Sequence, residues 1–532
     1  MSIPKYNNLT SNSAFKDLSA YDTSKVSLPN IINEKRINRY DIAITKDLRF
    51  NYAAKQVNED VLAKLQAVAD EQKVIEQYRL LINGEIINTG EGRKVLHHLC
   101  RGQLGDDVIE DGGNLRTFYT KQQKRIRKFS ESVQNGSITG STGKTFSTVV
   151  QIGIGGSDLG PRALYHSLKR YVKENSGNLR MNAHFISNVD PDDANEILAD
   201  IDFERTLFVL VSKSGTTQET LTNEAFVREH MKKAGIPEEK QKNHFVAVTS
   251  QTSPLADSSE YLDSFYIDDY IGGRYSSSSA VGNTVLTLAF GADIFDEFLS
   301  GAHEADKNAL EADIQKNPAM LDALIGMFER NILEYPSTAV LPYSQSLYRF
   351  PAHLQQLDME SNGKQVNRYG EPIDYSTGPI IFGEPGTNGQ HSFYQLLHQG
   401  TDVIPLQFIG FQEPQYKFDL NYSGSSSQKK LNANLTAQIV AFLGGKKDDN
   451  KNKNFPGNRP SSLIYGKELT PKALGALLAH FENKVMFQGF IWNINSFDQE
   501  GVQLGKVLTK QLLGESDIDP ILNAYGKILG VL

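Results

Sequence analysis

The chain has 532 residues, of which 39% are hydrophobic and 22% are charged, and its formal net charge is −8 at pH 7. This length predicts two or three domains, and the acidic balance argues against a nucleic acid or an anionic membrane as the partner. The single cysteine, Cys100, excludes an internal disulfide and a cysteine-cluster metal site. Because no apolar run approaches the ~20 residues of a membrane span and no signal-peptide pattern is evident, we expect a cytoplasmic protein.

Residues 1–115 are charged and rich in helix formers, which predicts a helical N-terminal segment. Between residues 116 and 290, short apolar runs alternate with helical patterns, and the strands are predicted at "STVVQIG", "AHFIS", "RTLFVLVS" and "HFVAVTS". Apolar strands that alternate with helices predict a parallel sheet covered on both faces.

A helical connection at 291–335 is predicted to lead into a second domain of the same design at 336–510, with strands at "TAVLPY", "GPIIFGE" and "DVIPLQFI". Helices are predicted to dominate again from about residue 427, and 511–532 is predicted to be a helical tail. The polar stretch 445–462 is predicted to be a solvated surface loop. The predicted fold class is therefore α/β, with two doubly wound parallel-sheet domains and helical extensions at both ends.

A run of hydroxyl side chains directly follows the apolar strand "LFVLV", in the loop "SKSGTTQET" at 212–220. In an open parallel sheet ligands bind at the carboxyl ends of strands, and the N-terminus of the next helix attracts anions. Ser212, Ser214, Thr216 and Thr217 could therefore hold a phosphate dianion. The alternative is that Thr216 or Thr217 only caps the helix.

The second strand-to-helix turn, "GIGGSDLG" at 153–160, lets a ligand approach the backbone closely. It does not predict a dinucleotide site, because Asp158 occupies the third glycine position of G-x-G-x-x-G. "GSTGKT" at 140–145 is not a P-loop, because it lacks the first glycine and precedes a strand. No nucleotide cofactor is predicted, and the histidines lack the spacing of metal ligands.

Candidate catalytic side chains lie in later loops. Arg274 follows two glycines in "GGRYSSSS" and could neutralise an oxyanion, and Glu360 ends the predicted helix at "LDMES" and could act as a base. His391 is predicted at a helix start, where the neutral imidazole is favoured. Gln499 and Lys506 are predicted near one face of a late helix. Each of these residues, taken alone, also fits an ordinary exposed side chain.

The order of these motifs resembles the glucose-6-phosphate isomerase family, which has two sugar-isomerase (SIS) domains. The matching stretches span about residues 151–506 and are "IGIGGSDLGP", "SKSGTTQET", "YIGGRYS", "QQLDMESNGK", "GEPGTNGQHSF" and "NSFDQEGVQLGK". The resemblance implies reversible conversion of glucose 6-phosphate and fructose 6-phosphate, through ring opening and a cis-enediol intermediate, in glycolysis and gluconeogenesis. It also implies a homodimer with shared active sites and no cofactor or metal.

The same resemblance implies a role for each candidate residue. Glu360 would move the proton between C2 and C1, and Arg274 would stabilise the cis-enediolate. His391, oriented by Glu219 and reaching the site from the neighbouring subunit, would assist ring opening together with Lys506. The substrate would be bound by Gly156, Ser157, Ser212, the backbone around Lys213, Ser214, Thr217, Gln356 and Gln499.

Two departures from the family pattern leave the preference among phosphosugars open. Gly215 stands where animal members carry a bulky aromatic residue, and the serines after Arg274 stand where many members carry larger apolar residues. The alternative function is a non-catalytic phosphosugar-binding regulator on the same fold, since a fold does not determine function. The joint presence of Glu360 and His391 argues against that alternative.

Overall fold

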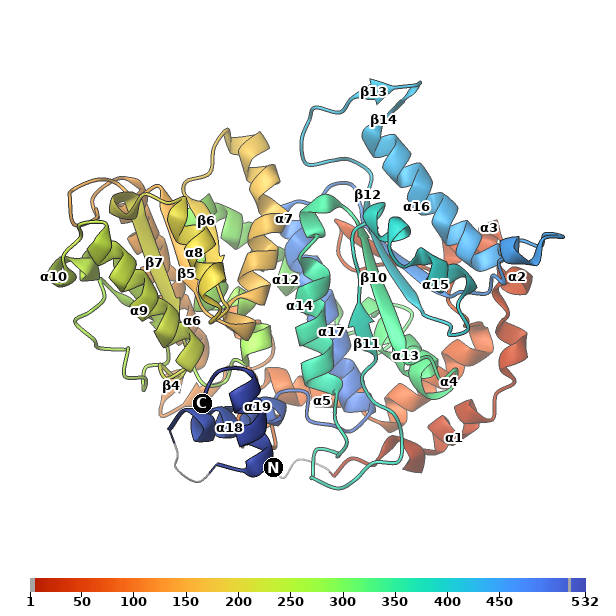
Figure 1. Ribbon diagram of the computed structural model, residues 1–532. Helices are drawn as coiled ribbons and strands as arrows, with labels where there is room; N and C mark the ends of the chain where they lie inside the picture. The colour runs from red at the N-terminus through yellow and green to blue at the C-terminus, as the bar shows by residue number, and fades with distance from the viewer. Residues whose placement is uncertain (1–4, 515–517) are drawn as a thin grey trace.

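The protein is described here by a computed structural model that covers residues 5–514 and 518–532. Residues 1–4 and 515–517, which fall in the predicted N-terminal segment and C-terminal tail, lie outside this description. The two predicted sheets are present and lie side by side, with helices between and around them (Figure 1). Among the described residues, no helix has both the length and the apolar character needed to cross a bilayer.

The first sheet is wholly parallel and has the strand order β6-β5-β7-β8-β9. Its strands are β5 (Thr148–Ile152), β6 (Asn182–Ile186), β7 (Thr206–Val211), β8 (Phe245–Thr249) and β9 (Ser264–Tyr266). Neighbouring residues of β5 face different apolar clusters, since Val149 belongs to one and Val150 to another. Burial on both faces explains why these strands carry continuous apolar runs.

The second sheet is mixed and has the order β1-β2-β15-β12-β10-β11. Its parallel strands are β10 (Ser337–Tyr343), β11 (Ile380–Phe382), β12 (Leu406–Phe411) and β15 (Ser461–Gly466). The antiparallel edge is made by β1 (Asp41–Ala43) and β2 (Leu48–Asn51), which come from the segment predicted to be helical. We keep the boundaries 116–290 and 336–510 as proposed domains, with β1 and β2 added to the second sheet.

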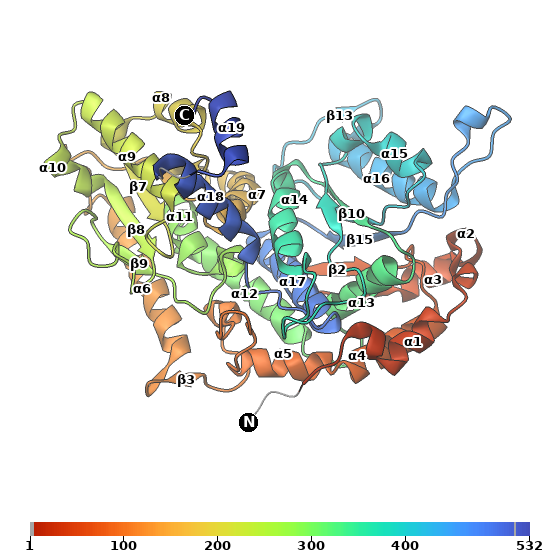
Figure 2. The same ribbon diagram turned by 60° about the horizontal axis from the view of Figure 1, so that its bottom comes forward.

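Helix α17 (Pro471–Ile491) runs through the middle of the molecule and is buried along nearly its whole length. It packs against α12 (Ala292–Asn308) and α13 (Pro318–Asn331), which come from the predicted connection (Figure 2). Its buried charged side chains form ion pairs, as Glu482 does with Arg101 and Lys484 does with Asp322. α17 belongs to a large apolar cluster that also includes residues of both sheets.

The remaining elements cover the sheets or lie at the surface. The helices are α1 (Ser13–Ser19), α2 (Leu28–Ile31), α3 (Glu34–Arg39), α4 (Glu59–Glu71), α5 (Val74–Ile82), α6 (Leu115–Gln134), α7 (Leu159–Ser176), α8 (Pro191–Ala199), α9 (Gln218–Lys233), α10 (Glu238–Gln241), α11 (Ala280–Phe290), α14 (Phe350–Gln355), α15 (Tyr394–Gln399), α16 (Ser427–Gly444), α18 (Gln503–Gly514) and α19 (Pro520–Ile528). Two small hairpins are formed by β3 (Ile109–Glu110) with β4 (Gly113–Asn114) and by β13 (Asn421–Tyr422) with β14 (Ser425–Ser426).

Candidate active site

The predicted phosphate loop and the glycine turn leave the first sheet at the same edge. The turn η4 (Gly155–Ser157) follows β5, and the loop 212–217 follows the adjacent strand β7. A Cβ atom placed on Gly153 would lie 3.1 Å from the carbonyl oxygen of Val211, which shows how closely the two strand ends approach. Both motifs are thus at the carboxyl edge of the sheet, where ligands bind in folds of this kind.

The loop 212–217 is held together by its own hydroxyl groups. The Ser212 Oγ atom is buried, lies 3.0 Å from Thr217 Oγ1 and accepts a 3.1 Å hydrogen bond from the backbone N–H of Gly215. Thr217 occupies the N-cap position of α9, yet within the described chain its side chain makes no capping hydrogen bond. The capping alternative is therefore wrong for Thr217, and the N-terminal N–H groups of α9 point toward the loop without a side-chain cap.

The side chain of Lys213 points away from this loop. Its Nζ atom donates hydrogen bonds to the carbonyl oxygens of Asp269 (3.0 Å) and Ile271 (3.1 Å). Burial lowers the pKa of the Lys213 amino group from its ordinary value. Lys213 therefore connects the loop to the segment that precedes Arg274, and its amino group is directed away from the hydroxyl groups of the loop.

Gly156 and Arg274 meet backbone to backbone. Arg274 lies in the turn η7 (Gly273–Ser278), which packs against η4. A Cβ atom placed on Gly156 would lie 2.1 Å from the carbonyl carbon of Gly273 and 2.7 Å from the backbone nitrogen of Arg274. Only glycine fits this contact, and the contact fixes the position of the Arg274 backbone relative to η4.

The Arg274 guanidinium is buried, and its Nε and Nη2 groups are hydrogen-bonded. Its Nε donates to Ser361 Oγ (2.6 Å), and its Nη2 donates to the carbonyl oxygens of Ser496 (2.6 Å) and Asp498 (2.9 Å). Its Nη1 lies 3.5 Å from Oε2 of Glu360. The predicted base and the predicted oxyanion stabiliser are thus neighbours, although Arg274 follows a strand of the first sheet and Glu360 lies between two strands of the second.

Glu360 is the last residue of a single π-helical turn, η9 (Gln356–Glu360), which continues α14. Such turns are rare and often occur at functional sites. Gln356 lies at the start of this turn, and its side chain approaches Gly155. A Cβ atom placed on Gly155 would lie 3.4 Å from the Nε2 atom of Gln356. The buried atoms Glu360 Oε2 and Gln356 Oε1 have no hydrogen-bond partner among the described residues.

The chain does not bring together the remaining predicted catalytic residues. His391 and Lys506 are exposed, and Glu219 lies in the first turn of α9. Within residues 5–514 and 518–532, neither hydrogen bond nor ion pair joins His391 to Glu219 or Lys506 to Glu360. The predicted role of these residues is therefore not visible within one chain.

Two details of the predicted local structure were wrong. His391 ends the short turn η10 (Asn388–His391) and so does not start α15, which removes the helix-dipole argument for its neutral form. Gln499 is exposed and precedes the turn η12 (Glu500–Val502), whereas α18 begins only at Gln503. Gln499 and Lys506 therefore do not share one helix.

Sequence reasoning missed the residues that hold Arg274 in place. Ser361 follows Glu360 directly, and the carbonyl groups of Ser496 and Asp498 lie in the loop before η12. Lys364 forms an ion pair with the Asp498 carboxylate and secures that loop. Nothing in the local pattern marked these residues, because their role depends on contacts between distant segments.

Comparison with known proteins agrees with this architecture. The family model described as phosphoglucose isomerase matches residues 51–526. A curated glucose-6-phosphate isomerase of Treponema denticola is 61% identical over 93% of this chain and 93% of its own length, and that of Borreliella burgdorferi is 51% identical over 94% of each.

A solved structure shows the same likeness in three dimensions. The crystal structure of a glucose-6-phosphate isomerase from Chlamydia trachomatis superposes with a TM-score of 0.90 at 41% identity and covers 99% of this chain and 100% of that one. The fold likeness, the family model and the sequence identity all agree. The chain therefore belongs to the phosphoglucose isomerase family.

Proposed function

We propose that the protein interconverts glucose 6-phosphate and fructose 6-phosphate in the space between η4, η7 and η9, as part of glycolysis and gluconeogenesis. The observation that carries this proposal is the pair formed by Arg274 and Glu360. A buried guanidinium faces a carboxylate oxygen at 3.5 Å, and that oxygen is buried without a hydrogen-bond partner among the described residues. A base beside a fixed positive charge is what an enediolate intermediate requires.

In the proposed reaction Glu360 removes the proton from C2 of the open aldose and returns it to C1. The electrons of the broken C–H bond move toward the C1 carbonyl oxygen, and the proton of the C2 hydroxyl passes to that oxygen, so the two oxygens of the cis-enediolate share the negative charge. Arg274 stabilises that charge with its guanidinium group. Glu360 then returns its proton to C1 while the C2–oxygen bond becomes a carbonyl, and the product is the ketose with a hydroxyl on C1.

The phosphate of the substrate is proposed to bind at the loop 212–217. Ser212, Ser214 and Thr217 supply hydroxyl groups, and the uncapped first turn of α9 supplies N–H groups and the positive end of a helix dipole. Gly156 and Ser157 line the sugar site between this loop and Glu360, and Gln356 and Gln499 contact the substrate. The phosphate does not take part in the reaction, so binding it raises the affinity for the substrate and aligns the sugar carbon chain with Glu360.

A homodimer with shared active sites is proposed to complete the site. His391 is exposed on its own subunit, and it would reach the partner's site, where Glu219 orients it and Lys506 joins it in opening the ring. The hairpin region around β13 and β14, which projects from the second domain, carries Phe418 at 86% and Tyr422 at 72% exposure (Figure 1). Large exposed apolar side chains often mark a protein–protein contact, which supports the proposal that a second copy of this chain packs against this hairpin.

The runner-up function, a phosphosugar-binding regulator without activity, is not favoured. The relatives that cover most of the chain are isomerases, and both Arg274 and Glu360 are in place. We also propose a cytoplasmic location, because sugar phosphates are charged and do not cross membranes unaided.

A coupled assay tests the activity most simply. Purified protein is given fructose 6-phosphate, and glucose 6-phosphate is read through a dehydrogenase that reduces NADP. Wild type and the control Glu229→Gln, which changes an exposed glutamate of α9, should be equally active. Glu360→Gln should lose about 10²–10⁴ in rate, the usual contribution of a general base. An inactive wild type would contradict the proposed activity, and an active Glu360→Gln would contradict the assignment of the base.

A further inference from the structure

The orientation of Arg274 depends on two hydroxyl groups that take no direct part in the proposed chemistry. Its Nε bonds to Ser361 Oγ at 2.6 Å, and its Nη2 bonds to two backbone carbonyl groups. The two carbonyl contacts hold the Nη2 atom in place. The hydrogen bond from Nε to Ser361 then determines how the plane of the guanidinium is turned. As a result Nη1 is the edge that faces Glu360.

The Ser361 hydroxyl is itself fixed. It is fully buried, and its oxygen lies 3.1 Å from the hydroxyl oxygen of Tyr275. Because Nε can only donate, Ser361 must present a lone pair to it, and the hydrogen bond with Tyr275 restricts how the hydroxyl can turn. Ser361 follows Glu360 in the chain, so one short segment carries the base and the group that aims Arg274.

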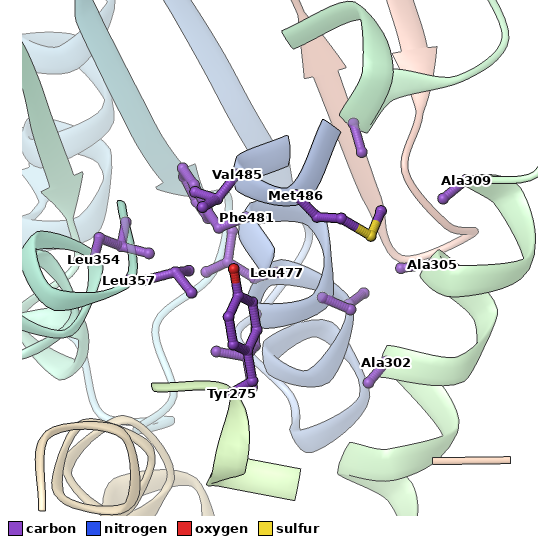
Figure 3. Close-up of a cluster of buried hydrophobic side chains, with 14 of the residues drawn as sticks. Tyr275, Ala302, Ala305, Ala309, Leu354, Leu357, Leu477, Phe481, Val485 and Met486 are labelled. Carbon is purple, nitrogen blue, oxygen red and sulfur yellow. The ribbon is translucent and has the colours of Figure 1, made fainter. Parts of the chain in front are cut away.

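Tyr275 is held firmly from the other side. Its ring stacks on His97 with centroids 4.9 Å apart and contacts Phe497 at 5.5 Å. Figure 3 shows Tyr275 rising from its turn with its hydroxyl oxygen directed among Leu357, Leu477 and other apolar side chains. Burial raises the pKa of the Tyr275 hydroxyl, so it stays neutral. A hydroxyl in such surroundings needs a partner, and Ser361 is that partner.

We infer that Tyr275 and Ser361 are positioning residues that align Arg274 with the developing enediolate. Tyr275 belongs to the first domain and Ser361 to the second, so their hydrogen bond also sets the distance between the two catalytic segments. This inference rests on the proposed function of Arg274 and Glu360. It goes further by stating which groups make Arg274 effective in the transition state.

The first test separates transition-state effects from substrate binding. Ser361→Ala should lower kcat about 10- to 100-fold, somewhat less than the loss of an oxyanion donor itself, while KM changes by less than about threefold. Tyr275→Phe keeps the ring and should lower kcat about 3- to 10-fold, since one hydrogen bond is lost. The control Tyr78→Phe removes another buried tyrosine hydroxyl, which bonds to the Asp306 carbonyl oxygen, and should leave kcat unchanged.

A second readout uses two inhibitors that differ in charge. A five-carbon aldonate 5-phosphate places a planar carboxylate where the enediolate forms, whereas a hexitol 6-phosphate has no such charge. For both variants the inhibition constant of the aldonate should rise by the same factor by which kcat falls. The inhibition constant of the hexitol should not change. A general loss of structure would weaken both inhibitors.

A double-mutant cycle with Arg274→Ala distinguishes this inference from the proposed function. If Arg274→Ala leaves kcat unchanged, the proposed role of Arg274 fails. If it slows the reaction, Ser361→Ala should have no further effect in that background, because it acts through Arg274. The inference is overturned if Ser361→Ala is fully active alone, or if it lowers kcat by the same factor with and without Arg274.

Discussion

Gly156→Ala is expected to slow the reaction strongly without changing any catalytic side chain. The Cβ of alanine would lie 2.1 Å from the carbonyl carbon and 2.2 Å from the carbonyl oxygen of Gly273, whereas ordinary contact begins at 3.4 Å. All the nearest atoms belong to the backbone, so no flexible side chain can move aside. The turns η4 and η7 must therefore separate by more than about 1 Å, the deficit in that contact.

The size of the effect follows from that displacement. A shift of about 1 Å in a catalytic group can lower the rate about 10²-fold, so kcat should fall by roughly that factor because Arg274 moves with η7. Inserting a methyl group into a packed contact should also lower the free energy of unfolding by about 1–3 kcal/mol. Circular dichroism should still show a folded protein at 25 °C.

The assay compares kcat from the coupled reaction with stability from urea denaturation. Gly444→Ala is the matched control, since its Cβ would meet nothing within 4 Å at the end of α16, and it should be fully active. If Gly156→Ala is as active and as stable as wild type, the contact between η4 and η7 does not position Arg274. The steric reasoning would then be refuted.

The double variant Ser212→Ala with Thr217→Ala should raise KM at least about tenfold with a smaller change in kcat, because two hydrogen bonds to a charged group are lost; an unchanged KM would place the phosphate elsewhere. Burial raises the pKa of Asp358 to about 6. Because its unfolded value is near ~3.9, this carboxyl favours the folded state at low pH, and that stability is lost as the pH rises through about 4 to 6. Asp358→Asn should therefore raise the free energy of unfolding by about 1–3 kcal/mol at pH 8 and change it little at pH 4, as read by urea denaturation, and a loss of stability at pH 8 would contradict this. Mixing inactive His391→Ala with inactive Glu360→Ala should restore part of the activity through hybrid dimers, and no recovery after demonstrated subunit exchange would count against shared sites.

Most parallel strands of the two sheets could be predicted from sequence because they are buried on both faces, but β9 and β15 were not among the predicted strands. β7 is buried at every position, and such strands read as short apolar runs between helices. The edge strands could not be found this way. β2 spans only Leu48–Asn51, and it is a strand because it pairs with β15, near the other end of the chain. This pairing leaves no local signal in a segment that is otherwise rich in helix formers.

The candidate site was predictable only through the order of its motifs. Arg274 and Glu360 lie beside different sheets, and no local pattern reveals that their side chains approach within 3.5 Å. The π turn that ends at Glu360 was predicted as ordinary helix, since the extra residue in the turn has no sequence signal. Ser361 was noticed only as the residue after Glu360, because its role comes from Arg274 and Tyr275.

Proton exchange in Glu360→Gln tests the central claim most directly. The variant keeps the shape of the side chain and removes the base, so the reaction in deuterium oxide isolates the carbon-bound proton from ring opening. Wild type should incorporate deuterium at C2 of glucose 6-phosphate during turnover. Glu360→Gln should slow both isomerisation and incorporation by about 10²–10⁴. Incorporation at near the wild-type rate would show that another group is the base, and the account of the site would be contradicted.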